Sequence, residues 1–297
     1  MNATGTKSRI SLKNILYATD FSPSAEAALP YAVGLAKRYA GTVHGVHARY
    51  PATYPIVGPE AMPQVMDAAE EQAKSETQQL NEMLEGIPHQ VTVSEGDIWP
   101  MIHEIAGREK TDLIVIGTHG RTGFKRLLLG SVAEEIFRRA ACPVLTVGPH
   151  ASGNTERRLE MKEILFATDF SQESLAALPY AVSLAQEHQA GLMLLHVVEP
   201  SEKGDLVHAE LYADSIVRQL EKLVPKEAAS WCEPKYKVEK GDTAEKILEI
   251  AIGLGADLIV LGVRGTDGGM SAATHISQSV AHRIVTQAKC PVLTVRG

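Results

Sequence analysis

The chain has 297 residues, of which 44% are hydrophobic, and a formal net charge of −7. This acidic balance argues against a general nucleic-acid binder, which holds phosphate backbones with clustered Lys and Arg. Three cysteines are too few for a disulfide framework. Residues 1–9 are polar, and no run of about 18 apolar residues occurs in the chain. We therefore expect a soluble, cytoplasmic protein with neither a membrane nor a nucleic acid as partner.

The sequence contains one long internal repeat. Ala18–Ser22 (ATDFS) recurs as Ala167–Ser171 (ATDFS). Each copy is about 145 residues long, an ordinary size for a domain with its own core. The segment between the copies is polar and contains Gly and Pro. These features predict two domains, residues 1–148 and 161–297, joined by a linker over residues 149–160.

Short apolar runs alternate with segments of helical periodicity along both copies. In the first copy the expected strands are 14–19, 42–48, 90–94, 112–116 and 143–147. A helix of about 18 residues is expected after the first strand, and further helices are expected at 60–84, 99–108 and 131–140. In the second copy the expected strands are 163–168, 192–198, 235–239, 257–261 and 291–295, with helices between them. This alternation implies right-handed crossovers, so we expect an α/β fold whose mostly parallel sheets carry helices on both faces.

A glycine-rich segment follows the fourth expected strand of the first copy. It contains Gly117, Gly120 and, after nine intervening residues, Gly130 at the start of an expected helix. A bound phosphate needs backbone N–H groups free of side chains and a helix N-terminus that points at it. Three basic residues lie between the glycines: Arg121, Lys125 and Arg126. The segment therefore predicts a phosphate site, although glycines that only shape a turn are the alternative.

Ser131 directly follows the last of these glycines. Glu134 stands three residues further on, which is the spacing of a capping box. We therefore expect the Ser131 hydroxyl to cap the helix that begins here.

Asp20 ends the first expected strand, as Gly117 ends the fourth. In an open parallel sheet, ligands lie outside the carboxyl ends of the strands, where the winding reverses. Asp20 is thus a candidate acceptor for a ribose hydroxyl or ligand for Mg²⁺. The alternative is a turn or N-cap, because Asp169 occupies the same place in the second copy.

The pattern Gly117-x₂-Gly120-x₉-Gly130-Ser131, with Ala18-Thr19-Asp20 upstream and a terminal CPVLTV strand in each copy, resembles the ATP-binding class of the universal stress protein family. The resemblance covers essentially the whole chain, as two tandem domains. It implies two Rossmann-like, adenine nucleotide alpha hydrolase-like domains, each with a five-stranded parallel sheet of order 3-2-1-4-5. It also implies ATP, or AMP or ADP, together with Mg²⁺, at the junction of the first and fourth strands of domain 1.

The resemblance further implies which residues contact the nucleotide, and it implies no catalytic residue. Adenine is expected against the backbone near His47. The remaining implied contacts are Ala18, Thr19, Asp20, Ile116, Gly117, His119, Gly120, Arg121, Gly130, Ser131, Val132 and Ala133.

The histidines predict no clear metal site. His44 and His47 are three residues apart on an expected strand, so their side chains should point to opposite faces. A zinc site that uses His47, His119 or His103 remains open as an alternative.

The second copy departs from the glycine pattern. It keeps Gly262 and Gly265, but the following loop is three residues longer, Gln278 takes the place of Gly130, and Asp267 replaces basic charge. A carboxylate in a partly desolvated site repels polyphosphate. We expect domain 2 to bind nucleotide weakly or not at all.

The two last strands provide an expectation for assembly. In single-domain members of the family that the chain resembles, the last strand pairs across a two-fold axis. The resemblance therefore implies that residues 144–147 pair with residues 292–295 in an intramolecular pseudo-dimer, and this pairing would protect two open sheet edges. A further homodimer is expected by analogy with the family.

The function we expect is a nucleotide-dependent stress-response or signalling protein. The alternatives are a slow Mg²⁺-dependent ATPase, with Asp20 at the metal, or a nucleotide-free dimerisation scaffold. No nucleophile stands beside a general base in the sequence and no Walker A pair is present, so we do not expect fast hydrolysis.

Overall fold

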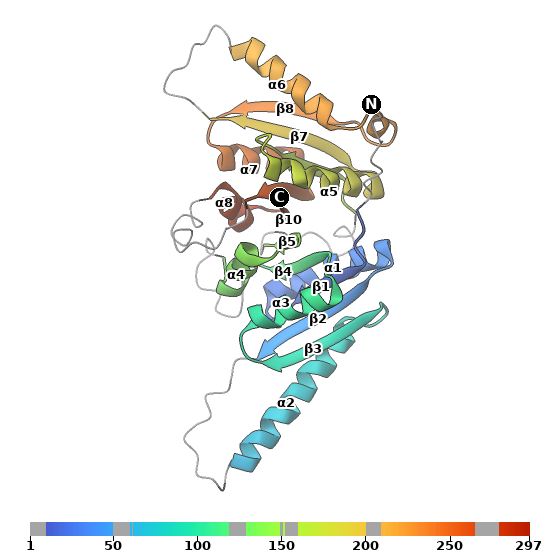
Figure 1. Cartoon of the computed structure of the whole chain (residues 1–297), viewed down its shortest axis with the longest axis vertical. Coiled ribbons are helices and arrows are strands. Elements are labelled where there is room, and N and C mark those ends of the chain that lie inside the picture. Colours follow the sequence, from blue (N-terminus) through green and yellow to red (C-terminus); the bar gives the residue numbers. More distant parts are fainter. Residues whose placement is uncertain are drawn as a thin grey trace.

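The structure is a computed structural model that describes residues 10–49, 60, 62–118, 129–148, 151, 160–199, 209–264 and 279–297. Its strands are β1 (Asn14–Ala18), β2 (Thr42–Arg49), β3 (His89–Glu95), β4 (Leu113–Gly117), β5 (Val144–Val147), β6 (Glu163–Ala167), β7 (Gly191–Val198), β8 (Lys235–Lys240), β9 (Leu258–Val263) and β10 (Val292–Arg296). Its α-helices are α1 (Pro23–Tyr39), α2 (Met62–Met83), α3 (Ile98–Glu109), α4 (Ser131–Arg139), α5 (Gln172–His188), α6 (Ala209–Leu223), α7 (Thr243–Leu254) and α8 (Val280–Gln287). A 3₁₀-helix, η3, spans Lys226–Ser230. The expected elements are therefore confirmed to within a few residues at their ends (Figure 1).

The strands form one sheet of order β3-β2-β1-β4-β5-β10-β9-β6-β7-β8. Within each half the strands are parallel and follow the expected order 3-2-1-4-5. The halves meet where β5 and β10 run antiparallel, with Leu145 opposite Leu293. The expected pairing of the two last strands is thereby confirmed, and the tandem domains fit a pseudo-dimer inside one chain (Figure 1).

Helices cover both faces of this sheet, as expected. One buried apolar cluster includes residues of α1, α2, α5 and α6. The other includes residues of α3, α4, α7 and α8. Strands such as Ile114–Ile116 of β4 contribute side chains to both clusters in turn, because successive side chains point to opposite faces.

The first helix of each half begins in the same way. The Ser22 hydroxyl accepts a hydrogen bond from the N–H of Ala25 at 3.3 Å, and the Ser171 hydroxyl accepts one from the N–H of Ser174 at 3.2 Å. These caps satisfy N–H groups that a helix leaves free at its start. They fix the turn that carries Asp20 in the first half.

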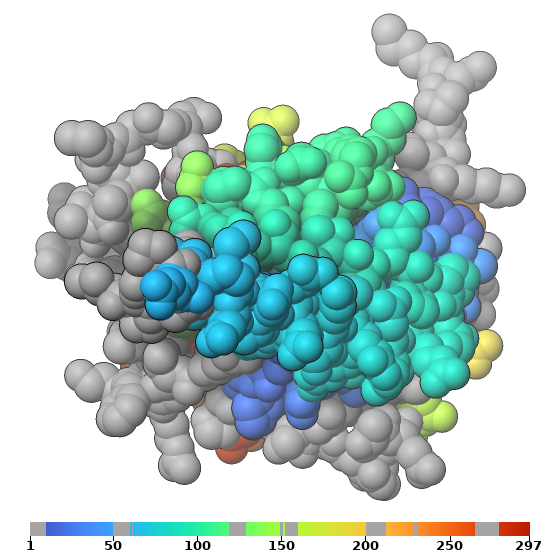
Figure 2. Space-filling view, turned by 90° about the horizontal axis from the view of Figure 1, so that it is seen from below, coloured from blue at the N-terminus to red at the C-terminus, as the bar shows by residue number. Residues whose placement is uncertain are grey.

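The helix α2 extends from the outer edge of the sheet beside β3 (Figure 1). Figure 2 shows it lying across this end of the molecule. Of its described residues only Leu80 is buried. None of the helices in the described ranges is long and apolar enough to cross a membrane.

Candidate functional site

The carboxyl ends of β1 and β4 lie side by side in the first half. Ala18 pairs with Ile116 in parallel register, and both side chains are buried. The N–H of Thr19 then donates to the carbonyl oxygen of Val46 at 3.0 Å. Asp20 therefore lies just beyond the end of β1 and Gly117 ends the neighbouring strand β4, at the point where the order of winding reverses.

The start of α4 is brought back to this edge of the sheet. The N–H of Gly130 donates a hydrogen bond to the carbonyl oxygen of Thr118, one residue beyond β4, at 2.8 Å. Thr118 itself is fully buried, and nothing in the sequence pattern marked it. This contact closes the glycine-rich segment and places the N-terminus of α4 beside the end of β4.

The N-terminus of α4 is not capped as the sequence predicted. Gly130 is the N-cap residue, with extended φ and ψ of −61° and 148°, and it has no side chain to accept a hydrogen bond. Ser131 is the first helical residue, so the capping-box prediction is wrong. The N–H of Glu134 donates to the carbonyl oxygen of Gly130 at 2.8 Å. No acceptor among the described residues reaches the N–H groups of the three residues between them, Ser131, Val132 and Ala133.

N–H groups at the positive end of a helix that have no protein acceptor can bind an anion. Gly130 has no side chain that could shield the N–H groups at the start of α4. Among the predicted site residues that the structure describes, the N-terminus of α4 offers the best support for phosphate binding.

Asp20 has a structural role. Its Oδ1 atom accepts a hydrogen bond from the N–H of Ser22 at 3.0 Å, and Asp169 accepts one from Ser171 at the same distance. The alternative reading as a turn residue is therefore confirmed in both copies. The ligand role of the Asp20 carboxylate stays a prediction.

Gly117 is required by packing rather than by a tight turn. A Cβ atom at Gly117 would lie 2.5 Å from the carbonyl oxygen of Ser24 and 2.8 Å from the nitrogen of Ala25. At Gly262, its counterpart, a Cβ would lie 2.1 Å from the carbonyl oxygen of Glu173. The first turn of α1 or α5 passes directly over each strand end, which only glycine permits.

His47 is buried and ties three elements together. Its Nδ1 atom lies 2.8 Å from the carbonyl oxygen of Thr19, its ring centroid lies 4.6 Å from that of Phe21, and its Nε2 atom lies 3.9 Å from Glu76 of α2. The histidine of the second copy, His196, makes the same contact with Thr168 at 2.8 Å. The His47 side chain therefore shapes the crevice, and adenine contact with its backbone stays a prediction.

His44 and His47 point to opposite faces of the sheet, as expected. His44 interacts electrostatically with Glu109 and Arg108 at the end of α3, whereas His47 lies next to Glu76 of α2. Burial lowers the pKa of His44. Over the ranges that the structure describes, no group of three His, Cys, Asp or Glu side chains is placed to hold a metal.

Several predicted residues lie outside the described residues. They are His119, Gly120, Arg121, Lys125 and Arg126 in the first copy and Gly265, Asp267 and Gln278 in the second.

The model of the universal stress protein family matches residues 11–148 and again residues 160–296. The chain belongs to the universal stress protein family. A universal stress protein of Thermus aquaticus is 36% identical over 140 residues, which is 46% of this chain and 98% of the relative.

Two further comparisons extend this result. A universal stress protein of Methanocaldococcus jannaschii is 50% identical over 66 residues, so the match spans 22% of this chain and 33% of that relative. The crystal structure of a universal stress protein from Archaeoglobus fulgidus has a TM-score of 0.67 at 23% identity and covers 97% of this chain and 99% of its own. That likeness shows the tandem fold.

The second universal stress protein domain has a cavity of about 410 Å³ at the carboxyl ends of β6, β7 and β9. Its size lies within the range of small-molecule sites, roughly 300 to 1,000 Å³. The repeat counterparts of predicted domain 1 contacts line it: Ala167, Thr168, Asp169, Leu261, Gly262, Val280 and Ala281. In domain 2, the residues equivalent to these predicted contacts therefore lie around the same cavity.

The charges of this cavity do not suit phosphate. Asp169, Glu173 and Glu199 line it, against the single described cation Arg264, which lies 3.7 Å from Glu173. Burial raises the pKa of Asp169, but hydrogen bonds from Ser171 outweigh it and leave that pKa below its ordinary value, so the carboxylate stays ionised. A polyphosphate here would meet mostly negative charge.

The helix end at this cavity is also occupied. The Ser279 hydroxyl is the N-cap of α8 and accepts a hydrogen bond from the N–H of His282 at 3.2 Å. Ser131, its aligned counterpart, has no such role in α4. The two universal stress protein domains thus differ in how many helix N–H groups they present.

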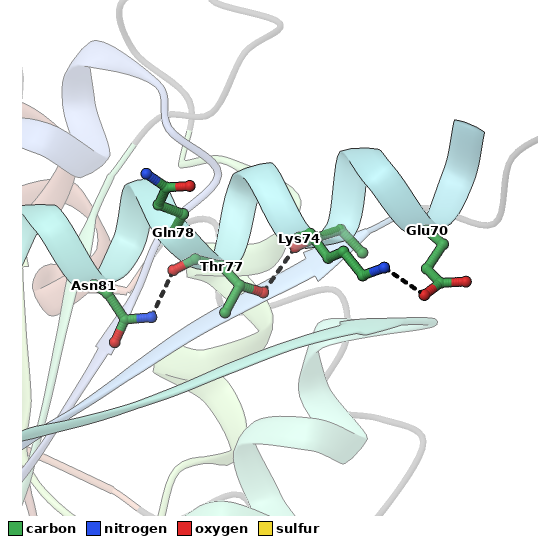
Figure 3. Close-up of a pocket in the computed structure, with 6 residues that line it drawn as sticks. Glu70, Lys74, Thr77, Gln78 and Asn81 are labelled. Carbon is green, nitrogen blue, oxygen red and sulfur yellow. Dashed lines mark hydrogen bonds and ion pairs between the residues drawn. The ribbon is translucent and has the colours of Figure 1, made fainter. Parts of the chain in front are cut away.

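A second hollow of about 480 Å³ lies along α2 (Figure 3). Its polar groups bind one another: Lys74 pairs with Glu70 at 2.7 Å, and Asn81 donates to the carbonyl oxygen of Thr77 at 2.8 Å. Because the named lining residues all come from one helix, we assign it no function.

Proposed function

We propose that domain 1 binds ATP or another adenine nucleotide, and that its occupancy makes the protein a nucleotide-dependent stress-response or signalling component. The observation that carries this proposal is the start of α4, where Gly130 caps without a side chain and three N–H groups have no described acceptor. Such a helix end binds anions through its N–H groups and its dipole. Family membership is consistent with this assignment.

The residues present fit a nucleotide whose phosphates lie at the start of α4 and whose ribose lies near Asp20. Phosphate oxygens accept from the N–H groups at the start of α4, while Asp20 offers acceptor oxygens at the end of β1 for a ribose hydroxyl or for Mg²⁺. Mg²⁺, when bound, neutralises phosphate charge. His119, Gly120 and Arg121 belong to the same proposed site. The apolar wall is formed by Ala18 and Ile116.

A slow ATPase and a nucleotide-free scaffold are the competing functions. Steady-state phosphate release tests the ATPase alternative. Typical enzymes turn over on the order of 10 times per second, so a rate below about one turnover per hour would exclude an ATPase function. Cytoplasmic localisation and a homodimer of the tandem chain belong to the same proposal, and sedimentation of the full chain measures the latter.

The decisive experiment compares nucleotide content and affinity in matched variants. The small-molecule fraction of purified protein is analysed, and the protein is then titrated calorimetrically with ATP and AMP. Gly130→Val places a branched side chain at the helix N-terminus and should abolish both signals. Gln278→Val alters the aligned position of domain 2 and should leave both unchanged. Nucleotide retained by Gly130→Val at wild-type affinity would refute the assignment.

A further inference from the structure

Arg296 stands at the end of β10 in domain 2, and its guanidinium reaches into domain 1. Its Nη2 atom donates hydrogen bonds to the carbonyl oxygens of Phe137 at 3.1 Å and Arg138 at 2.7 Å. Both carbonyls lie in the last turn of α4, where a helix leaves carbonyl oxygens without partners. A cation there also interacts favourably with the helix dipole. Arg296 thus caps α4 from the other domain.

The helix that Arg296 caps is the one that carries the proposed phosphate site. α4 is only nine residues long, so its two ends move together. At its N-terminus, Gly130 is held by its hydrogen bond to Thr118 at 2.8 Å. At its C-terminus, the described polar contact with domain 2 is that of Arg296.

The junction between the domains fixes the position of Arg296. Two residues before it, Thr294 pairs with Val144 in antiparallel register, and the Thr294 hydroxyl donates to the carbonyl oxygen of Val144 at 3.3 Å. From the other strand, the Thr146 hydroxyl donates to the carbonyl oxygen of Val292 at 3.1 Å. The guanidinium is therefore presented to α4 from an ordered strand.

Among the residues that the structure describes, this contact has no reciprocal counterpart at the end of α8. Gly148 is the repeat counterpart of Arg296, since each follows the shared CPVLTV segment. A Cβ atom at Gly148 would lie 3.6 Å from the carbonyl oxygen of Ala288, the C-cap residue of α8. Gly148 thus faces the matching helix end but has no side chain to cap it. The connection runs from domain 2 to the α4 helix of domain 1.

We propose that Arg296 is a positioning residue through which domain 2 sets the affinity of domain 1 for the phosphates of its nucleotide. This inference rests on the proposed function of domain 1. With Arg296 in place, α4 is held at both ends, and the N–H groups at its start keep a fixed direction. Without it, α4 shifts relative to the ends of β1 and β4, and phosphate contacts weaken while contacts with the base and ribose do not.

The test uses the full chain and two ligands. Arg296→Met keeps an apolar stem and removes the guanidinium. The matched control is Arg283→Met, which removes a domain 2 guanidinium whose described contacts are Asp242 and Glu245 of the same domain. Affinities for ATP and for adenosine are measured by calorimetry. We expect Arg296→Met to weaken ATP binding about fivefold and to change adenosine binding by less than about twofold. Arg283→Met should change neither.

Equal weakening of ATP and adenosine would show a general structural role and overturn the inference, as would unchanged ATP binding. A wild-type chain that binds no ATP would overturn the proposed function and this inference with it. Should Arg296→Met fail to fold, Arg296→Gln keeps a donor, loses the charge, and should weaken ATP about twofold to threefold with adenosine unchanged.

Discussion

Asp112 and Asn14 form two hydrogen bonds with each other where β4 and β1 begin. The N–H of Asp112 donates to the carbonyl oxygen of Asn14 at 2.8 Å, and the N–H of Asn14 donates to Oδ2 of Asp112 at 2.9 Å. The same Oδ2 atom accepts from the N–H of Lys13 at 2.8 Å. Asp257 repeats this arrangement with Lys162 at 2.7 Å. One carboxylate thus aligns the starts of β1 and β4.

Replacing Asp112 by Ala should therefore destabilise the protein by about 2 kcal/mol, because hydrogen bonds to a charged acceptor are lost from two backbone N–H groups. Urea unfolding measures the change. Asp112→Asn keeps one carbonyl acceptor and should cost less. An alanine variant as stable as the wild type would show that water replaces these bonds at no cost.

Gly117→Ala should destabilise the protein by about 1 to 3 kcal/mol, because the added methyl group meets backbone atoms of α1 that cannot move independently. Gly107→Ala is the matched control: it lies within α3 with open space around its Cβ position and should be neutral or slightly stabilising. Thermal unfolding distinguishes the two. Equal unfolding temperatures for both variants would contradict the packing role of Gly117.

The aligned serines Ser131 and Ser279 should respond differently to replacement by Ala. Ser279→Ala removes the cap of α8 and should cost about 1 kcal/mol. Ser131→Ala removes no cap and should lie within about 0.5 kcal/mol of the wild type. Unfolding midpoints in urea provide the measurement. A larger loss at Ser131 would mean that its hydroxyl has a structural partner.

His188 should make the protein less stable below neutral pH. Burial, and then the charge of Arg38, lower its pKa from 6.5 to about 4, although Glu187 opposes this. As the pH falls below 6.5 the unfolded chain takes up this proton first, so stability is lost progressively until about pH 4. In His188→Gln the loss of stability between pH 7 and pH 5, measured by urea unfolding, should be smaller. Parallel pH profiles for the two proteins would rule His188 out.

Calorimetric titration should find about one ATP site per chain, because the domain 2 cavity is lined mainly by carboxylates and its helix end is self-capped. In Gly130→Val, the site should disappear rather than fall by half. Two equal sites in the wild type would refute the predicted difference between domains.

Much of the fold could be predicted from the sequence because its patterns are local or repeated. The apolar run Leu113–Gly117 is typical of a strand buried on both faces, and β4 lies in the interior of the sheet. The pairing of β5 with β10 is implied by the family resemblance, and it has a physical motive because each strand would otherwise be an open edge. The division at residues 149–160 stays a prediction about how the domains fold.

The site was less predictable, because its contacts depend on how distant elements meet. A serine followed three residues later by glutamate indicates a capping box, but it does not reveal that Gly130 takes the N-cap position itself. The need for glycine at position 117 follows from the path of α1 over β4. Arg296 contacts a carbonyl 158 residues away in the chain, which no local pattern could reveal.

The bond between Arg296 and the end of α4 has a consequence for how such a protein can change. In a dimer of identical subunits, any substitution at the two-fold interface appears twice, in equivalent surroundings. Because the two halves are joined in one chain, positions 296 and 148 can differ. Arg296 therefore has a guanidinium, whereas Gly148 has no side chain. Gene duplication with fusion thereby permits a division of labour: one domain can specialise as a regulator of the other while the shared sheet is kept.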